Sequence, residues 1–121
     1  FYTPRVMADL IVERTLDPLV RAASSHDILA LRILDPAMGS GAFLVTACVF
    51  LAEAYEDALV ANGACQAHDV TDGDRARIRR LIAEHCLFGV DLNPMAVQLG
   101  RLSLWLATVI FVPLVGKGQE R

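Results

Sequence analysis

A short apolar run that ends in an acid and then passes through two glycines constrains this chain most. Residues 31–35 (Leu-Arg-Ile-Leu-Asp) are followed by Pro-Ala-Met-Gly-Ser-Gly and then by the apolar residues 42–44. This order predicts a strand, a tight turn and a helix, because Gly39 and Gly41 have no Cβ and can adopt positive φ. The free N–H groups at the start of the helix face the same turn. The turn is therefore a candidate ligand-binding loop.

The loop lacks the two common phosphate-binding patterns. A P-loop ends in Gly-Lys-Ser/Thr and a dinucleotide loop has three glycines spaced G-x-G-x-x-G/A, and neither pattern occurs here. Asp35 at the end of the strand would also repel an anion. The sequence therefore favours a ligand that carries an amino group over a phosphate.

A second apolar run, residues 86–91, has the same form and also ends in an acid. Asn93 and Pro94 follow it and are typical of a helix cap and a first helical residue. The first run shows little alternation, so we expect its strand to be buried on both faces, as in a parallel sheet. Strand, helices, strand, helix is the order of an α/β protein with a parallel sheet.

Asp35 and Asp91 end the two predicted strands. Ligands of open parallel sheets bind beyond the carboxyl ends of the strands, so we expect both acids at one crevice. A carboxylate in this position can accept hydrogen bonds from the paired hydroxyls of a ribose, and we assign this role to Asp91. The alternative is that Asp91 only caps the next helix.

The residues before the first strand predict helices. A helix begins at Pro4 with Thr3 as its cap, and Asp17-Pro18 predicts a break near Leu16. A short second helix then reaches about Ala23. Residues 24–27 are polar and are expected to form the connection into the strand.

The residues between and after the strands predict two further helices. One covers residues 41–61, and 64–74 form a surface loop. Asp74 is expected to cap a helix over residues 75–85. Residues 109–115 are β-branched and are either a third strand or an ending that packs on another segment.

Composition excludes several classes of protein. The apolar stretches of the 121-residue chain are shorter than the roughly 20 residues that span a bilayer, and no pattern of a secretory signal is visible in it. Three cysteines cannot form a closed set of disulfides, so we expect a cytoplasmic protein. The net charge of −3 lacks the basic bias of a stand-alone nucleic-acid binder.

Two side-chain clusters are expected to be structural. Cys65, His68, His85 and Cys86 do not have the spacing of a zinc site. The arginines of residues 75–80 are expected to form a solvated helix face that an Arg80–Glu84 pair supports; they are Arg75, Arg77, Arg79 and Arg80.

Three segments together resemble a known family. Phe1-Tyr2-Thr3-Pro4 resembles an F/Y-x-T-P element, and residues 35–44 resemble the loop D-P-A/F-C/M-G-S-G-x-F/L. Residues 89–96 (Gly-Val-Asp-Leu-Asn-Pro-Met-Ala) resemble a second cofactor motif. In this order the segments resemble the amino-terminal, cofactor-binding part of S-adenosylmethionine-dependent N6-adenine DNA methyltransferases with gamma-ordered motifs. These enzymes belong to type I and type IIG restriction-modification and related phage-defence systems.

The resemblance implies a fold and a set of site residues. The fold would be part of a Rossmann-like methyltransferase, with residues 1–121 as one partial domain, 1–30 as a helical lead-in and 31–121 as the partial core. Asp35 and Gly39 would hold the methionine part of the cofactor, Asp91 the ribose and Leu92 the adenine face. The implied cofactor-binding residues are Tyr2, Thr3, Pro4, Asp35, Pro36, Ala37, Gly39, Gly41, Phe43, Asp91 and Leu92. No catalytic residue and no metal ligand is assigned.

The resemblance also implies an activity and partners. A methyl group would pass from S-adenosyl-L-methionine to adenine in double-stranded DNA, with the DNA held by parts of the protein outside this chain and by a specificity subunit or domain. The family's catalytic loop, N/D-P-P-Y/F, does not occur in the chain. We therefore expect the chain alone to transfer no methyl group and to self-associate through its apolar faces.

Two alternatives are a methyltransferase of RNA, protein or small molecules and a non-catalytic assembly module. The Tyr2-Thr3-Pro4 element favours DNA over the first alternative. The missing catalytic loop favours the second alternative if the chain is the entire protein.

Overall fold

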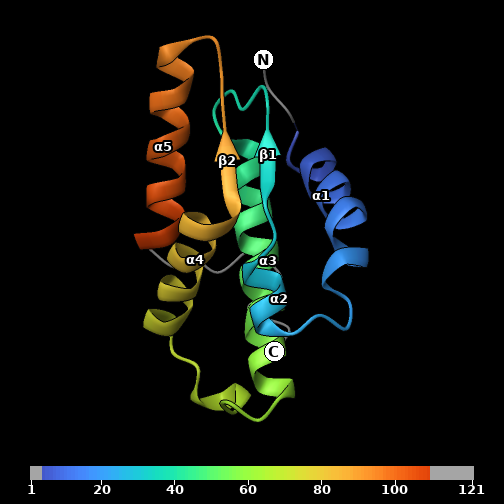
Figure 1. Ribbon diagram of the computed structural model, residues 1–121. Coiled ribbons are helices and arrows are strands. Elements are labelled where there is room, and N and C mark those ends of the chain that lie inside the picture. Colours follow the sequence, from blue (N-terminus) through green and yellow to red (C-terminus); the bar gives the residue numbers. More distant parts are fainter. Residues whose placement is uncertain (1–3, 110–121) are drawn as a thin grey trace.

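Two short parallel strands lie among five helices in the computed structural model, which describes residues 4–109 (Figure 1). In chain order the elements are α1 (Arg5–Val20), α2 (Ser25–Leu29), β1 (Ile33–Asp35), α3 (Ala42–Ala61), a 3₁₀ turn η1 (Ala67–Asp69), α4 (Asp72–Cys86), β2 (Leu87–Gly89) and α5 (Pro94–Val109). The predicted order of strand, helices, strand and helix is confirmed. These residues form a mostly helical α/β unit, and its two strands are fewer than a complete Rossmann-like fold has.

The register of the sheet places the two acid-bearing strand ends side by side. β1 pairs with β2 in parallel, with Ile33 opposite Leu87 and Asp35 opposite Gly89. Beyond the strands, the N–H of Val90 donates to the carbonyl of Asp35 at 3.1 Å. The predicted parallel pairing is therefore confirmed, although both strands are shorter than the sequence indicated.

One face of the sheet is left uncovered by the described residues. Within these residues, the prediction that the strand is buried on both faces is therefore wrong. Leu34 and Phe88, which lie opposite one another in the register, are 62% and 48% exposed. Neighbouring side chains along a strand point to opposite faces. In Figure 1 helix α3 runs behind the sheet, and α3 and α4 both contact β2. The helices therefore cover one face and leave the face that carries Leu34 and Phe88 uncovered.

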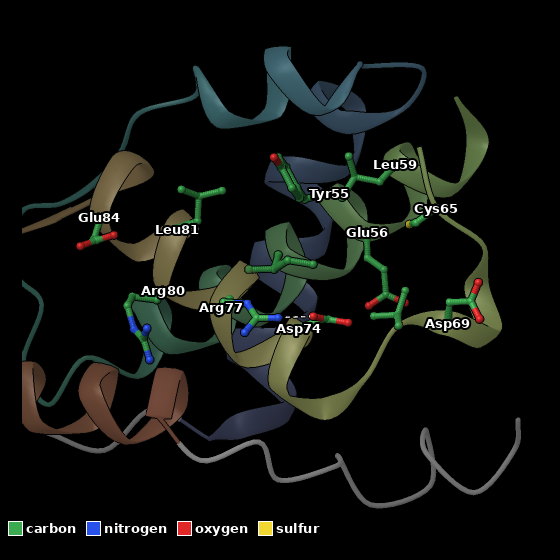
Figure 2. A pocket seen from close by; sticks show the side chains of 12 residues that line it. Tyr55, Glu56, Leu59, Cys65, Asp69, Asp74, Arg77, Arg80, Leu81 and Glu84 are labelled. Carbon is green, nitrogen blue, oxygen red and sulfur yellow. Dashed lines mark hydrogen bonds and ion pairs between the residues drawn. The ribbon is translucent and has the colours of Figure 1, made fainter. Parts of the chain in front are cut away.

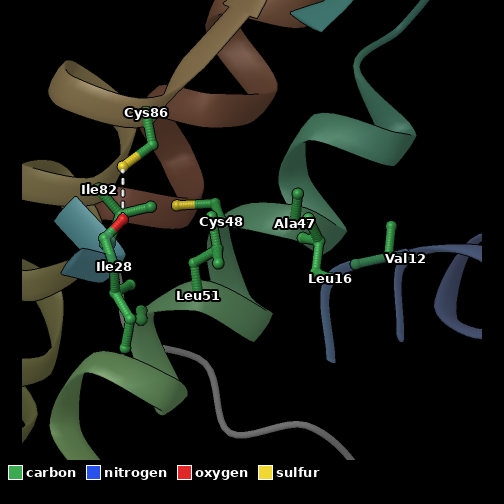
Figure 3. Packing of buried hydrophobic residues seen from close by; sticks show 9 residues of the cluster. Val12, Leu16, Ile28, Ala47, Cys48, Leu51, Ile82 and Cys86 are labelled. Atoms are coloured by element: carbon green, nitrogen blue, oxygen red, sulfur yellow. Dashed lines mark hydrogen bonds between the residues drawn. The ribbon is translucent and has the colours of Figure 1, made fainter. Parts of the chain in front are cut away.

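Helix α3 is the centre of the core and confirms the helix predicted over residues 41–61. It contacts α1, α2, α4 and α5, and its buried residues are Leu44, Ala47, Cys48, Leu51 and Ala52. Figure 3 shows Leu16 of α1, Ile28 of α2 and Ile82 of α4 packed around this helix. An apolar helix with little amphipathic pattern is stable in this position because it is surrounded on most sides.

Two of the three cysteines are part of this core. The thiol of Cys48 donates to the carbonyl of Arg79 at 3.4 Å, and that of Cys86 donates to the carbonyls of Ile28 and Leu29 (Figure 3). Burial raises the pKa of Cys48 to about 12 and also raises the pKa of Cys86. Both side chains therefore remain neutral thiols at physiological pH.

The amino-terminal helices differ from the prediction in two places. The break expected near Leu16 is absent, because α1 continues to Val20 with Pro18 inside it. Leu16 is buried in the core, and this burial offsets the hydrogen bond that Pro18 cannot donate. The segment 24–27, expected to be a connection, instead starts α2. Ser24 Oγ accepts the N–H of Asp27 at 3.1 Å, which is the first bond of a capping box.

Two helix starts are also displaced. Pro4, expected as a first helical residue, is the residue before α1, which begins at Arg5. Helix α4 is capped by Thr71 and not by Asp74, because Thr71 Oγ1 accepts the N–H of Asp74 at 3.1 Å and the carboxylate of Asp74 accepts the N–H of Thr71 at 3.0 Å. The bond from the Thr71 backbone lowers the pKa of Asp74. The cap predicted for Thr3 lies outside the described residues. Of the segment 109–115, Val109 is the last residue of α5, and 110–115 lie outside the described residues.

The arginines of α4 are only partly a solvated face, so that prediction is wrong for Arg75 and Arg79. Arg75 Nε donates to Glu56 Oε1 on α3 at 3.0 Å, and this hydrogen bond raises the pKa of the guanidinium. Arg79 is buried and donates to the carbonyl of Ala107, near the end of α5, at 3.3 Å. Arg77 pairs with Asp74. Within the described part of the chain Arg80 forms no ion pair with Glu84.

None of the helices between residues 4 and 109 has both the length and the apolar content needed to cross a bilayer.

The Arg79 contact generates a stability prediction. Arg79→Ala removes a buried charged donor from the carbonyl of Ala107 and is expected to lower the free energy of unfolding by about 1.5 to 3 kcal/mol. Arg80→Ala on the same helix, where the side chain is exposed, is the matched control and should change it by less than about 0.5 kcal/mol. Urea denaturation followed by circular dichroism measures both. Equal effects would show that Arg79 does not anchor α5.

Candidate functional site

The loops that follow the two strands lie next to each other and are joined by backbone and side-chain hydrogen bonds. The N–H of Met38 donates to the carbonyl of Val90 at 2.9 Å. The N–H of Gly39 donates to Asp91 Oδ2 at 3.0 Å. Both loops occupy the same end of the sheet in Figure 1. The structure therefore confirms that Asp35 and Asp91 stand at the carboxyl ends of adjacent parallel strands.

Asp91 joins the two loops, a role that the sequence did not reveal. Its Oδ2 accepts the N–H of Gly39, and its Oδ1 accepts the N–H of Asn93 at 2.8 Å. The bond from Asn93, and then the bond from Gly39, lowers the pKa of Asp91, so this carboxyl is ionised at neutral pH. The helix cap is Asn93, whose Oδ1 accepts the N–H of Met95 at 3.0 Å. Asp91 is therefore not simply a cap, and each of its oxygens retains a second lone pair for a ligand hydroxyl.

Asp35 has one oxygen satisfied by the loop and one without a partner. Asp35 Oδ1 accepts the N–H of Ala37 at 3.1 Å. Asp35 Oδ2 is buried and accepts no hydrogen bond from the described residues. A buried acceptor without a donor is costly, so the atom suits a ligand that brings its own N–H groups.

Both loop glycines adopt the positive φ that the sequence predicted, +52° for Gly39 and +88° for Gly41. Their surroundings differ. A Cβ added to Gly39 would meet no atom within 4 Å, whereas one added to Gly41 would lie 3.2 Å from the Cα of Gly100 in α5. Gly39 thus faces open space beside Asp91, as expected for a ligand-facing position. The missing Cβ of Gly41 thus also allows the close approach of helix α5.

The other predicted cofactor residues lie around these loops to different degrees. Leu92 is fully exposed directly after Asp91, and Pro36 and Ala37 are exposed in the first loop. Phe43 is half-buried and packs against the hydrophobic core. Pro4 is exposed at the start of α1, while Tyr2 and Thr3 lie outside the described residues.

Sequence reasoning missed three residues behind the loop. Met38 is only 7% exposed, although Ala37 before it is exposed and Gly39 after it is half-exposed. An added Cβ on Gly89 would lie 2.8 Å from Met38 Sδ, and one on Gly100 would overlap Met38 Cε. The available signal was the glycine inside the apolar helix 94–109, because an interior glycine destabilises a helix and often marks a close approach.

A separate groove lies at the other end of α3, where the loop with η1 leads into α4 (Figure 2). It has a volume of about 550 Å³ and is lined by Tyr55, Leu59, Cys65, Ile78 and other side chains of mixed charge. None of its lining residues belongs to the loops of Asp35 and Asp91, so the groove is not part of that site. Between residues 4 and 109, no group of three His, Cys, Asp or Glu side chains could hold a metal ion.

A family model supplies the relationship of the chain to known proteins. Residues 17–118 match the model described as MmeI, DNA-methyltransferase domain. No curated protein and no solved structure matches the chain. The matched residues include both strands, the glycine loop and the Asp91 loop described above. The chain therefore belongs to the family of MmeI DNA-methyltransferase domains.

Proposed function

We propose that the chain is the cofactor-binding part of a DNA adenine-N6 methyltransferase of a restriction-modification system, with S-adenosyl-L-methionine as methyl donor. Membership of the methyltransferase family supports the reaction class. The observation that carries the cofactor is the pair of acids at the strand ends, with one buried oxygen of Asp35 left without a donor. The Tyr2-Thr3-Pro4 element supports a DNA substrate, and the resemblance of the three motifs to those of N6-adenine DNA methyltransferases supports adenine.

The described residues fit this cofactor in their chemistry. Asp35 Oδ2 would accept an N–H from the methionine ammonium, which also balances the negative charge of the carboxylate. Gly39 would let the ligand approach the backbone, since no atom fills the space of its missing Cβ. Asp91 would accept the ribose hydroxyls with its remaining lone pairs, and the exposed Leu92 would pack on the adenine ring.

The bound cofactor supplies a methyl group on a positively charged sulfur. The chain would hold this group at the strand ends, while the target adenine has to leave the DNA helix to reach it. A net charge of −3 is unsuited to binding DNA alone, so we assign the DNA contacts and a specificity subunit or domain to parts outside residues 1–121. The N/D-P-P-Y/F loop does not occur in these residues, so we assign it to the same parts. A DNA substrate also implies a cytoplasmic protein.

Calorimetry tests the choice of cofactor. S-adenosylmethionine or its demethylated product is expected to bind the chain, and NAD is expected to bind at least about tenfold more weakly, because the loop presents acids and has no dinucleotide glycine pattern. Titrations of the three compounds under one buffer measure the difference. Preference for NAD would contradict the proposal.

The role of Asp91 can be tested with an isosteric variant. Asp91→Asn keeps one oxygen acceptor but removes the charge that holds Gly39 and would hold the ribose, so the Kd for S-adenosylmethionine is expected to rise at least about tenfold. Glu13→Gln, which removes a charge from the exposed side of α1, is the control and should leave the Kd unchanged. A Kd for Asp91→Asn equal to that of the control would exclude Asp91 from the site.

The two loop glycines are expected to respond differently to alanine. Gly39→Ala meets no protein atom, so its stability cost is the strain of positive φ, about 1 to 2 kcal/mol, while its methyl group occupies the space proposed for the cofactor. Gly41→Ala adds a 3.2 Å contact with Gly100 and should destabilise the chain further. Urea denaturation and calorimetry on both variants separate the effects. Unchanged cofactor binding by Gly39→Ala would show that this side of the loop is free of ligand.

A further inference from the structure

We propose that Met38 is a positioning residue of the cofactor site: its thioether, held between Gly89 and Gly100, sets the loop of Gly39 against Asp91. The inference rests on the proposed function and names a residue that supports the site without touching the cofactor.

The backbone of Met38 lies in the middle of the contacts that shape the loop. Its N–H donates to the carbonyl of Val90 at 2.9 Å, and its carbonyl accepts the N–H of Gly41 at 2.8 Å. The next residue, Gly39, donates to Asp91 Oδ2. A shift of Met38 would therefore disturb both the turn and its bond to Asp91.

The side chain of Met38 fills a slot that two glycines on different elements leave open. A Cβ on Gly89, at the end of β2, would lie 2.6 Å from Leu44 Cδ1 and 2.8 Å from Met38 Sδ, so Met38 shares this side of the slot with Leu44. A Cβ on Gly100, in α5, would overlap Met38 Cε. An interior helix glycine is less favourable than alanine by about 1 kcal/mol. The need to leave room for the Met38 methyl group therefore explains why position 100 of this helix is a glycine.

The same slot determines how closely α5 approaches the loop. The position of a Cβ on Gly100 is 3.6 Å from the carbonyl oxygen of Gly39 and 3.8 Å from the nitrogen of Gly41. Glycines have no side chains that could hold the loop in place. Met38 is the buried side chain of this loop, so its packing fixes the conformation that Gly39 and Gly41 make accessible.

A double-mutant cycle in the full chain tests the proposal. Met38→Ala leaves a void under the loop, and Gly100→Ala forces the Met38 methyl group out of its place, so each is expected to raise the Kd for S-adenosylmethionine about tenfold. In the double variant the new methyl group at position 100 takes the space of the lost Met38 Cε. The double variant is therefore expected to bind at least about threefold more tightly than Gly100→Ala.

Hydrogen exchange of the Gly39 amide provides a second measurement that needs no cofactor. This N–H donates to Asp91, so its exchange should become faster in each single variant and slower again in the double variant. Met38→Leu keeps most of the side-chain volume and is expected to affect both measurements less than Met38→Ala. This variant keeps the test available if Met38→Ala or Gly100→Ala fails to fold.

Two controls separate positioning from general stability. Gly73→Ala in α4 adds a methyl group 3.7 Å from its nearest neighbour, and Met7→Ala shortens an exposed side chain of α1, so both should leave the Kd and the Gly39 exchange unchanged. The free energy of unfolding is measured for every variant.

The possible results lead to different conclusions. Single variants of Met38 and Gly100 that lose stability but keep the wild-type Kd and Gly39 exchange would overturn the positioning role. Failure of the wild-type chain to bind S-adenosylmethionine would overturn the proposed function instead. In that case the hydrogen-exchange rate of the Gly39 amide alone tests the role of Met38. A slower exchange in the double variant than in the single variants supports this role, and additive increases of the rate overturn it.

Discussion

The hydrogen bond from the Gly39 amide to the Asp91 carboxylate holds the site together. It connects two loops that are 52 residues apart in the chain. Parallel pairing of β1 with β2 brings these loops into reach, and the bond then determines which side of the glycine loop stays open. The side chain proposed to bind the ribose is thus part of the scaffold of the loops. A substitution of Asp91 would change this scaffold as well as any ligand contact, which is why stability and affinity have to be measured together.

The helical core gives this end of the sheet its rigidity. Helix α3 begins at the glycine loop and is buried along its first half, so the loop is fixed to the most enclosed part of the molecule. Helix α5 follows the Asp91 loop and is held near its other end by the buried Arg79. The two loops therefore lead directly into helices that are anchored independently. This arrangement keeps the acids in register although the described sheet has only two strands.

The sequence predicted the parts of the fold that depend on local pattern. The glycines at positive φ, the long apolar helix and the acids after both strands follow from residue type and spacing. The predicted helix break near Leu16 and the predicted burial of the strand on both faces were wrong, because tertiary packing decides both features. The slot for Met38 was missed for a related reason. It is formed by residues from a loop, a strand and a helix, and no local pattern connects them.

The burial of two cysteines has a practical consequence for spectroscopy. Cys48 and Cys86 are enclosed and hold their protons tightly, whereas Cys65 is partly exposed at the groove beyond α3. Since the chain has three cysteines in total, a maleimide fluorophore or nitroxide would attach to the native protein at one place. That label would sit at the opposite end of α3 from the glycine loop. Ligand-induced movement at the strand ends could then be followed without introducing or removing any cysteine.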